Sequence, residues 1–189
     1  MKAAVILGST GILLSSAISR AMASEEEVGS TVAGGTLTAT TAGATLAGVT
    51  LDGSNQSVTG NSTQWTITDA RGTGAAWTLS ASATTPTSAG GGVETTARTI
   101  SVENLAITPG TVTAGTGSDA ATNIDAPLLP LSTSAQALVS ATSPSKGSYT
   151  LTPTFSLTIP ANAYRSNYYG AVGSTALNPY ISTITFTIA

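Results

Sequence analysis

The amino-acid sequence predicts an all-β protein, an antiparallel β-sandwich of the Greek-key or jelly-roll type. Threonine, alanine, serine, glycine and valine dominate the composition, and only 8% of the 189 residues are charged. β-Branched side chains such as threonine and valine fit the pleated surface of a strand. Glycines and prolines interrupt the chain at short intervals, as the turns of a sandwich or barrel require. This length is typical of one domain with a substantial core.

A disordered, mucin-like stalk would share the high threonine content and the low charge. This chain differs from such a stalk because leucine, isoleucine, tryptophan and phenylalanine alternate with polar residues in several segments. Side chains in that pattern can bury enough apolar area to offset the loss of chain entropy on folding. We therefore expect a folded domain.

Residues 1–23 have the pattern of a signal peptide. Lys2 provides the positive start, residues 3–18 are mostly apolar, and Ala21-Met22-Ala23 is a small-x-small cleavage site before Ser24. The apolar run is shorter than the roughly 20 residues that cross a bilayer. A retained anchor or a buried helix is the alternative. We expect an extracellular protein at the cell surface, without a membrane span in the mature chain.

Charge and cysteine content limit the partners. After residue 23 the chain has four basic and nine acidic residues, a net charge of −5, and no basic cluster. A nucleic-acid partner is therefore not expected. Because the chain has no cysteine, its stability outside the cell must come from packing and hydrogen bonds rather than from disulfides.

The N-terminal segment, residues 24–55, contains two weakly alternating stretches, at 36–40 and 45–51. Apolar residues there fall on one face and threonines on the other, which is the pattern of a half-buried strand. This segment pairs either within its own sandwich or with a neighbouring copy as a donated strand. The apolar residues that would fill a neighbour's groove are Leu37, Leu46, Val49 and Leu51.

Two stronger strands follow at 64–69 and 75–81, and each carries one of the two tryptophans. Glycines in the connection at 69–74 permit a tight turn, so we expect a hairpin. In a chain with so few aromatic residues, Trp65 and Trp77 are expected to anchor the core. Arg71 in the turn is placed to pair with Asp69 or to cap a carbonyl, and a glycan contact is the weaker alternative.

Further strands are expected at 98–102, 104–107, 136–140, 147–160 and 180–188. Pro153 predicts a bulge or an edge midway through 147–160, and the prolines at 127 and 130 exclude that stretch from the centre of a sheet. The last strand ends at the C-terminus, and we expect it to lie between two others because loose termini fray.

Residues 56–189 resemble the WxL-domain proteins, secreted surface proteins of Gram-positive-type bacteria. The resemblance rests on Trp77-Thr78-Leu79, on the turn at 68–74 before it, and on Tyr180 followed by Thr185-Phe186-Thr187-Ile188. Residues 157–164 are similar to the approach to the family's last hairpin. The resemblance implies an all-β domain held non-covalently at the cell wall, on peptidoglycan, without catalysis.

A weaker similarity, carried by residues 159–164 and the final strand, is to β-sandwich pilins and spore-coat-like subunits. Those proteins assemble by donating an N-terminal strand to a neighbour. Wall binding and self-assembly into a homopolymeric filament or pilus are thus the two functions that the sequence favours.

The chain lacks histidine and cysteine, which excludes the triads built on them, thiol chemistry and most zinc sites. A glycosidase with two facing carboxylates is the remote enzymatic alternative. We expect no enzyme, no cofactor and no metal, although the oxygen-rich loop at 119–125 has ligands of the kind that calcium favours. Aromatic faces bind sugars and proteins alike. The residues selected for contact with a wall glycan or a partner are Trp77, Leu79, Tyr164, Tyr168, Tyr169 and Tyr180.

Overall fold

Antiparallel β-strands make up most of the regular structure, which confirms the predicted all-β, sandwich-like class. The computed structural model describes residues 27–189, so the predicted signal peptide at 1–23 lies outside the described residues. Residues 33–189 form one compact unit, and the described part of the other unit, residues 27–32, contains no helix or strand. The helical elements of the described residues are two short 3₁₀ turns, Val102–Asn104 and Ala121–Asn123.

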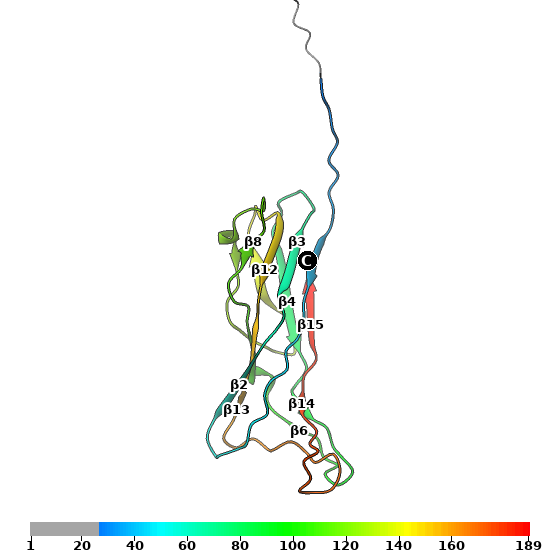
Figure 1. Ribbon diagram of the computed structural model, residues 1–189, viewed down its shortest axis with the longest axis vertical. Coiled ribbons are helices and arrows are strands. Elements are labelled where there is room, and N and C mark those ends of the chain that lie inside the picture. Colours follow the sequence, from blue (N-terminus) through cyan, green and yellow to red (C-terminus); the bar gives the residue numbers. More distant parts are fainter. Residues whose placement is uncertain (1–26) are drawn as a thin grey trace, which may run out of the picture. The chain divides into compact units, whose positions relative to one another are not determined.

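One layer of the sandwich consists of two four-stranded sheets that continue into each other, in the orders β1-β3-β12-β8 and β10-β7-β13-β2. The chain passes from one sheet to the other between β2 and β3, between β12 and β13, and between β7 and β8, as Figure 1 shows for the first two. These strands are β1 (Leu37–Thr40), β2 (Gln56–Asn61), β3 (Trp65–Asp69), β7 (Leu105–Thr108), β8 (Thr113–Ala114), β10 (Leu129–Pro130), β12 (Gly147–Leu151) and β13 (Thr154–Ile159).

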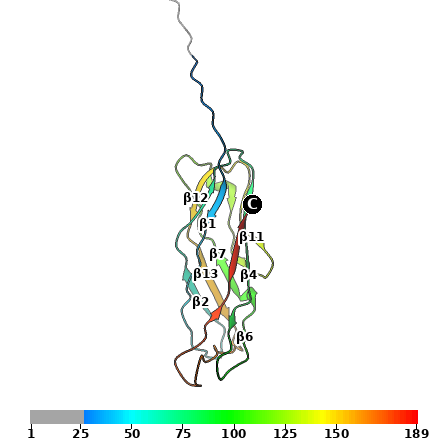
Figure 2. The same ribbon diagram turned by 90° about the vertical axis from the view of Figure 1, so that its right-hand side faces the viewer.

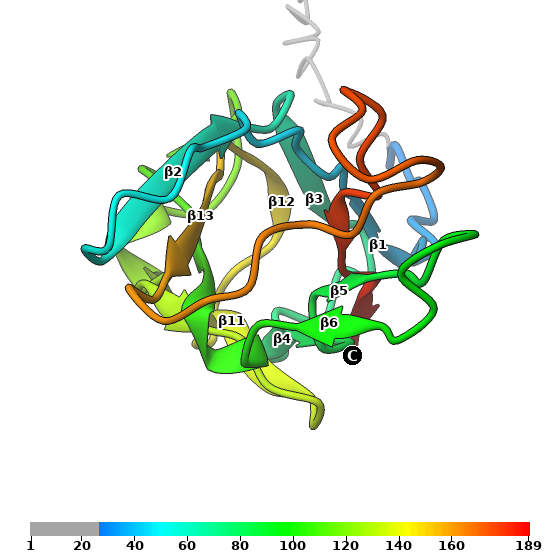
Figure 3. The same cartoon turned by 90° about the horizontal axis from the view of Figure 1, so that it is seen from below.

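The second layer has the order β15-β4-β11-β9 and is prolonged by a small sheet, β14-β5-β6. The view along the strands shows the two layers enclosing a common interior, with β2, β13, β12 and β3 on one side and β11, β4 and β6 on the other (Figure 3). These strands are β4 (Trp77–Ala83), β5 (Thr87–Ser88), β6 (Arg98–Thr99), β9 (Ile124–Asp125), β11 (Gln136–Ala141), β14 (Tyr180–Ile181) and β15 (Ile184–Ile188).

The core lies between the layers and is built by alternation along the strands. In β3 and β4 every second side chain is buried. Trp65 and Trp77 are 0% and 2% exposed, which confirms their predicted place in the core. Trp77 packs across the layers against Tyr149 of β12, with ring centroids 6.1 Å apart.

The predicted hairpin of the two tryptophan strands is wrong. β3 pairs with β1 and β12, whereas β4 pairs with β11 and β15 in the other layer. The connection crosses between the layers because Gly72 and Gly74 adopt φ of 74° and 67°, a region that favours glycine. Arg71 binds both carboxylate oxygens of Asp69, as predicted, at 2.9 Å each. This bidentate contact holds the start of the connection from β3 to β4.

Within the stretch predicted at 36–40, residues 37–40 form a strand, but residues 45–51 form none. That segment runs beside β2 but forms no ladder of backbone hydrogen bonds with it. The carbonyl of Thr45 lies so close to Gly60 that a Cβ on residue 60 would collide with it. The carbonyl of Thr50 accepts a hydrogen bond from the Gln56 side chain at 2.9 Å. Since β1 belongs to the compact unit, residues 33–55 and residues 56–189 fold together.

The C-terminal strand lies at a sheet edge rather than between two strands, which corrects the prediction. β15 pairs with β4 on one side only. Its other side faces β1, the edge strand of the opposite layer, and Figures 1 and 2 show the two close together. Proline also acts as predicted: Pro153 separates β12 from β13 where the chain changes sheets, and Pro130 lies in the edge strand β10.

Candidate functional site

The predicted contact residues divide into a buried and an exposed group. Trp77 and Leu79 are 2% and 1% exposed, and the Trp77 indole N–H donates to the carbonyl of Ser145 at 3.2 Å. Their side chains therefore offer no surface to a glycan or a partner, and the Trp-x-Leu motif is part of the core. The four tyrosines lie together in the loop before β14 and at the start of that strand.

Tyr164 and Tyr169 are the exposed members, at 69% and 71% of their surface. Tyr168 and Tyr180 are half-buried. The Tyr180 hydroxyl donates to the carbonyl of Tyr164 at 2.8 Å, so Tyr180 supports the loop that presents Tyr164.

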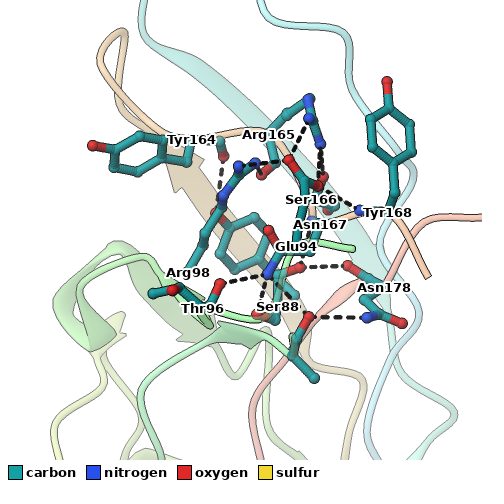
Figure 4. Close-up of polar contacts among 12 residues, drawn as sticks. Ser88, Glu94, Thr96, Arg98, Tyr164, Arg165, Ser166, Asn167, Tyr168 and Asn178 are labelled. Carbon is teal, nitrogen blue, oxygen red and sulfur yellow. Dashed lines mark hydrogen bonds and ion pairs between the residues drawn. The ribbon is translucent and has the colours of Figure 1, made fainter. Parts of the chain in front are cut away.

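Two loops, residues 88–98 and 163–178, pack against each other; we call them the loop cluster (Figure 4). The second loop carries Tyr164, Tyr168 and Tyr169, and Tyr180 follows it in β14. A Cβ on Gly91 would collide with the carbonyl of Tyr168, and one on Gly90 with the carbonyl of Thr95. The two backbones approach this closely because glycine has no side chain.

Glu94 is the electrostatic centre of the loop cluster. Its carboxylate accepts hydrogen bonds from Arg165 at 2.6 and 2.8 Å, from Arg98 at 2.9 Å and from the backbone N–H of Tyr168 at 2.8 Å. The Arg165 side chain, then the Tyr168 N–H, lower the pKa of Glu94 to about 2. A charged carboxylate thus ties both loops together at neutral pH.

Both arginines also stack on tyrosine rings. The guanidinium carbon of Arg165 lies 4.0 Å from the centroid of Tyr168, and that of Arg98 lies 5.4 Å from the centroid of Tyr164. Such contacts add a modest cation–π attraction. They also fix the orientation of the rings.

Asn167 is the buried tie between the two loops. It is 0% exposed, and its side-chain amide donates to the carbonyls of Thr96 and Ala89 at 2.8 and 3.1 Å. Its backbone N–H donates to the Ser88 hydroxyl at 2.9 Å, and that hydroxyl donates to the carbonyl of Asn178 at 2.7 Å. Sequence reasoning missed Asn167 and Glu94, because neither lies in a periodic segment.

A pocket of about 600 Å³ opens beside Tyr164. The polar side chains of Glu94, Thr95, Thr96 and Arg98 lie along it. The loop cluster therefore combines an exposed aromatic ring with a polar recess.

A second, larger groove of about 1190 Å³ lies at the seam between the two layers; we call it the seam groove. Residues 43–51 form one wall, and residues 179–184 with Phe186 form the other. Its floor consists of core residues, among them Leu105, Phe155 and Leu157.

The predicted donor residues belong to this region of their own chain. Leu37 is half-buried in β1, opposite Asp69 of β3, and Leu46 is half-buried against the core. Val49 and Leu51 are 41% and 36% exposed on the wall of the seam groove.

Four carboxylates, those of Asp52, Asp69, Glu94 and Asp119, have lowered pKa values. A glycosidase acid needs a raised pKa. Hydrogen bonds from Arg71 lower the pKa of Asp69, those from Lys146 lower that of Asp119, and those from Ser54 lower that of Asp52. Among residues 27–189 no three histidine, cysteine or acidic side chains gather as metal ligands would.

Comparison with protein-family models, with curated proteins and with solved structures found no match to this chain. Within the described part of the chain, no helix has the length and the apolar character needed to cross a membrane.

Proposed function

We propose that this protein is an exported, non-catalytic surface component of the WxL type that binds cell-wall glycan, peptidoglycan in particular, through its loop cluster. The observation that carries the proposal is the exposure of Tyr164 and Tyr169 on loops that an internal network holds in place. Aromatic rings bind the apolar faces of sugars, and a ring that is already oriented loses little entropy on binding.

The polar recess supports the same ligand class. Sugar hydroxyl and acetamido groups need donors and acceptors, which Thr95, Thr96 and Arg98 supply beside the Tyr164 ring. The four carboxylates with lowered pKa are committed to ion pairs or turns, which favours binding over hydrolysis.

Co-sedimentation with purified peptidoglycan tests the proposal. We expect the double variant Tyr164→Ala/Tyr169→Ala to bind at least about tenfold more weakly, since aromatic anchors commonly carry more than 1 kcal/mol of binding energy each. The matched control is Leu128→Ala, which removes another exposed apolar side chain, 58% exposed, outside the loop cluster.

Both variants should melt like the parent, because exposed side chains contribute little to stability. Unchanged sedimentation of the tyrosine variant with peptidoglycan would show that the loop cluster is not the glycan site. Export is tested separately: N-terminal sequencing of the surface protein should return Ser24, and Met1 would contradict processing.

A further inference from the structure

We propose that the seam groove binds the N-terminal segment of a second copy of this chain, residues 27–33, as an added β-strand. This inference goes beyond glycan binding and does not depend on it. It also shortens the donor segment suggested by the sequence, residues 24–55, to residues 27–33, because residues 37–51 fold into their own domain.

The seam groove is a gap that could accommodate one additional strand. Along the upper part of the seam, β1 closes the gap by packing beside β15. Beyond Thr40 the chain leaves the ladder, and residues 43–51 run along the gap without pairing to β2 or β15. The core floor between this segment and β15 is therefore open to an inserted segment.

The free side of β15 provides the backbone for such an insertion. β15 pairs with β4 on one side, and within the described residues no strand pairs with its other side. The half-buried side chains of Ile184 and Phe186 line the seam groove from this strand. An added strand would gain main-chain hydrogen bonds from β15 and apolar contacts from the floor.

Residues 27–33 have the side chains that this groove needs. Val28 and Val32 are 100% and 95% exposed, the largest exposed fractions of any large apolar residue in the described chain. In a strand, residues two and four apart share a face, so both valines would point to the same side. The residues between them are glycine, serine and threonine, which fit a narrow seam.

Charge favours the same occupant. The charged residues that line the seam groove, Arg98 and Arg165, share one carboxylate, that of Glu94, and together keep a net positive charge. The segment begins with Glu27, and two further glutamates at 25 and 26 precede it. Their attraction would speed association and weaken in high salt.

We assign the segment to another copy because residues 35 and 36 are held at the end of β1 opposite to the end that leads into the seam groove. The Gly35 N–H donates to the carbonyl of Ala70 at 2.7 Å, and the Ala70 N–H donates to the carbonyl of Thr36 at 3.0 Å. These bonds prolong the pairing of β1 with β3 backward along the chain.

Sedimentation velocity over a range of concentrations tests the proposal on the purified protein as the cell processes it. We expect concentration-dependent self-association, and at least about a tenfold loss of it in Val28→Asp/Val32→Asp, the size of effect that a buried apolar anchor carries. The matched control, Gly29→Asp/Thr31→Asp, adds the same charges on the opposite face and should associate nearly as well as the parent.

The groove is tested by Ile181→Asp, since Ile181 lines it and is 63% exposed, so the variant should fold. It should lose self-association, whereas Leu128→Asp, outside the groove, should keep it. A labelled peptide of residues 24–36 should bind the Val28→Asp/Val32→Asp chain, whose groove is intact, and should not bind that chain when it also carries Ile181→Asp.

Three results would overturn the proposal. The first is equal loss of association in both tail variants, which would mean that charge alone acts. The second is self-association that survives the valine changes. The third is a parent protein that stays monomeric at every concentration. That result would overturn the proposal even if the peptide binds, because the groove would then be filled by the chain's own segment. None of these results bears on peptidoglycan binding, so the two proposals fail separately.

Discussion

The ring of Phe186 meets the indole of Trp65 edge-on, with centroids 4.8 Å apart and an interplanar angle of 75°. Phe186 lies three residues from the C-terminal residue in β15, whereas Trp65 begins β3 in the opposite layer. Phe155 of β13 approaches the same indole, at 6.3 Å. One tryptophan thus joins the C-terminal edge strand to the two sheets of the other layer.

Replacing Trp65 by alanine should cost about 3–5 kcal/mol of unfolding free energy, because it removes the buried ring and leaves a cavity. Trp65→Phe should cost less, since it keeps most of the ring packing. It loses the indole hydrogen bonds to the Ser62 hydroxyl at 2.9 Å and to the carbonyl of Ala42 at 3.0 Å. Urea denaturation measures both variants, and a native-like midpoint for Trp65→Ala would contradict the core assignment.

Replacing Arg71 by alanine should destabilise the fold by about 1–3 kcal/mol, the cost of leaving a buried acceptor without its partner. The Asp69 carboxylate is buried, and it would keep only the backbone N–H of Arg71, at 3.0 Å. Arg71→Lys is the matched variant: it retains the charge and loses the two-pronged contact, so we expect an intermediate loss. Equal urea midpoints for Arg71→Ala and the parent would show that the bidentate contact between Arg71 and Asp69 does not stabilise the connection from β3 to β4.

Alternation in the sequence predicted where most strands lie, but not how they pair. Period-two alternation marks which face of a strand is buried and carries no information about its neighbour. For that reason β3 and β4 were placed correctly at their tryptophans and wrongly joined as a hairpin. The turn at 69–76 looks like a hairpin turn, yet its glycines serve equally well in a crossing between layers.

The candidate site could be predicted only through its tyrosines, which stand out because aromatic residues are scarce in this chain. Glu94 and Asn167 are isolated polar residues in loops, a context in which such residues are usually solvated. Their partners are remote in sequence: Arg165 lies 71 residues from Glu94, and Ser88 lies 79 residues from Asn167. Only the folded chain brings them together.

The loop cluster should loosen in acid. The folded-state pKa of Glu94 is about 2, below the ordinary value of 4.5, so its contribution to stability is fully present above about pH 4.5 and is lost as the pH falls toward 2. In an NMR titration the amide proton of Tyr168, which donates to this carboxylate, should report the midpoint. Glu94→Gln should abolish that transition, and a transition near pH 4.5 in the parent would contradict the ion pairs.

Replacing Asn167 by alanine should uncouple the two loops without unfolding the sandwich. The change leaves the carbonyl of Thr96 without its buried donor, at a cost of about 1–3 kcal/mol, whereas the Ala89 carbonyl keeps the amide of Asn178. Because the loop cluster lies beyond the Trp65 and Trp77 core, we expect faster amide exchange in residues 88–98 and 163–178 and near-parental exchange in β3 and β4.

The matched control is Asn178→Ala, which removes a single amide hydrogen bond, to the carbonyl of Ala89 at 2.9 Å, at an exposed position. It should leave the exchange of the loop cluster almost unchanged. Peptidoglycan binding should follow the same order, with Asn167→Ala weaker than Asn178→Ala, because Tyr164 and Tyr169 stay in place and only their orientation is lost. Full binding by Asn167→Ala together with fast loop exchange would show that a preformed loop cluster is not what the glycan recognises.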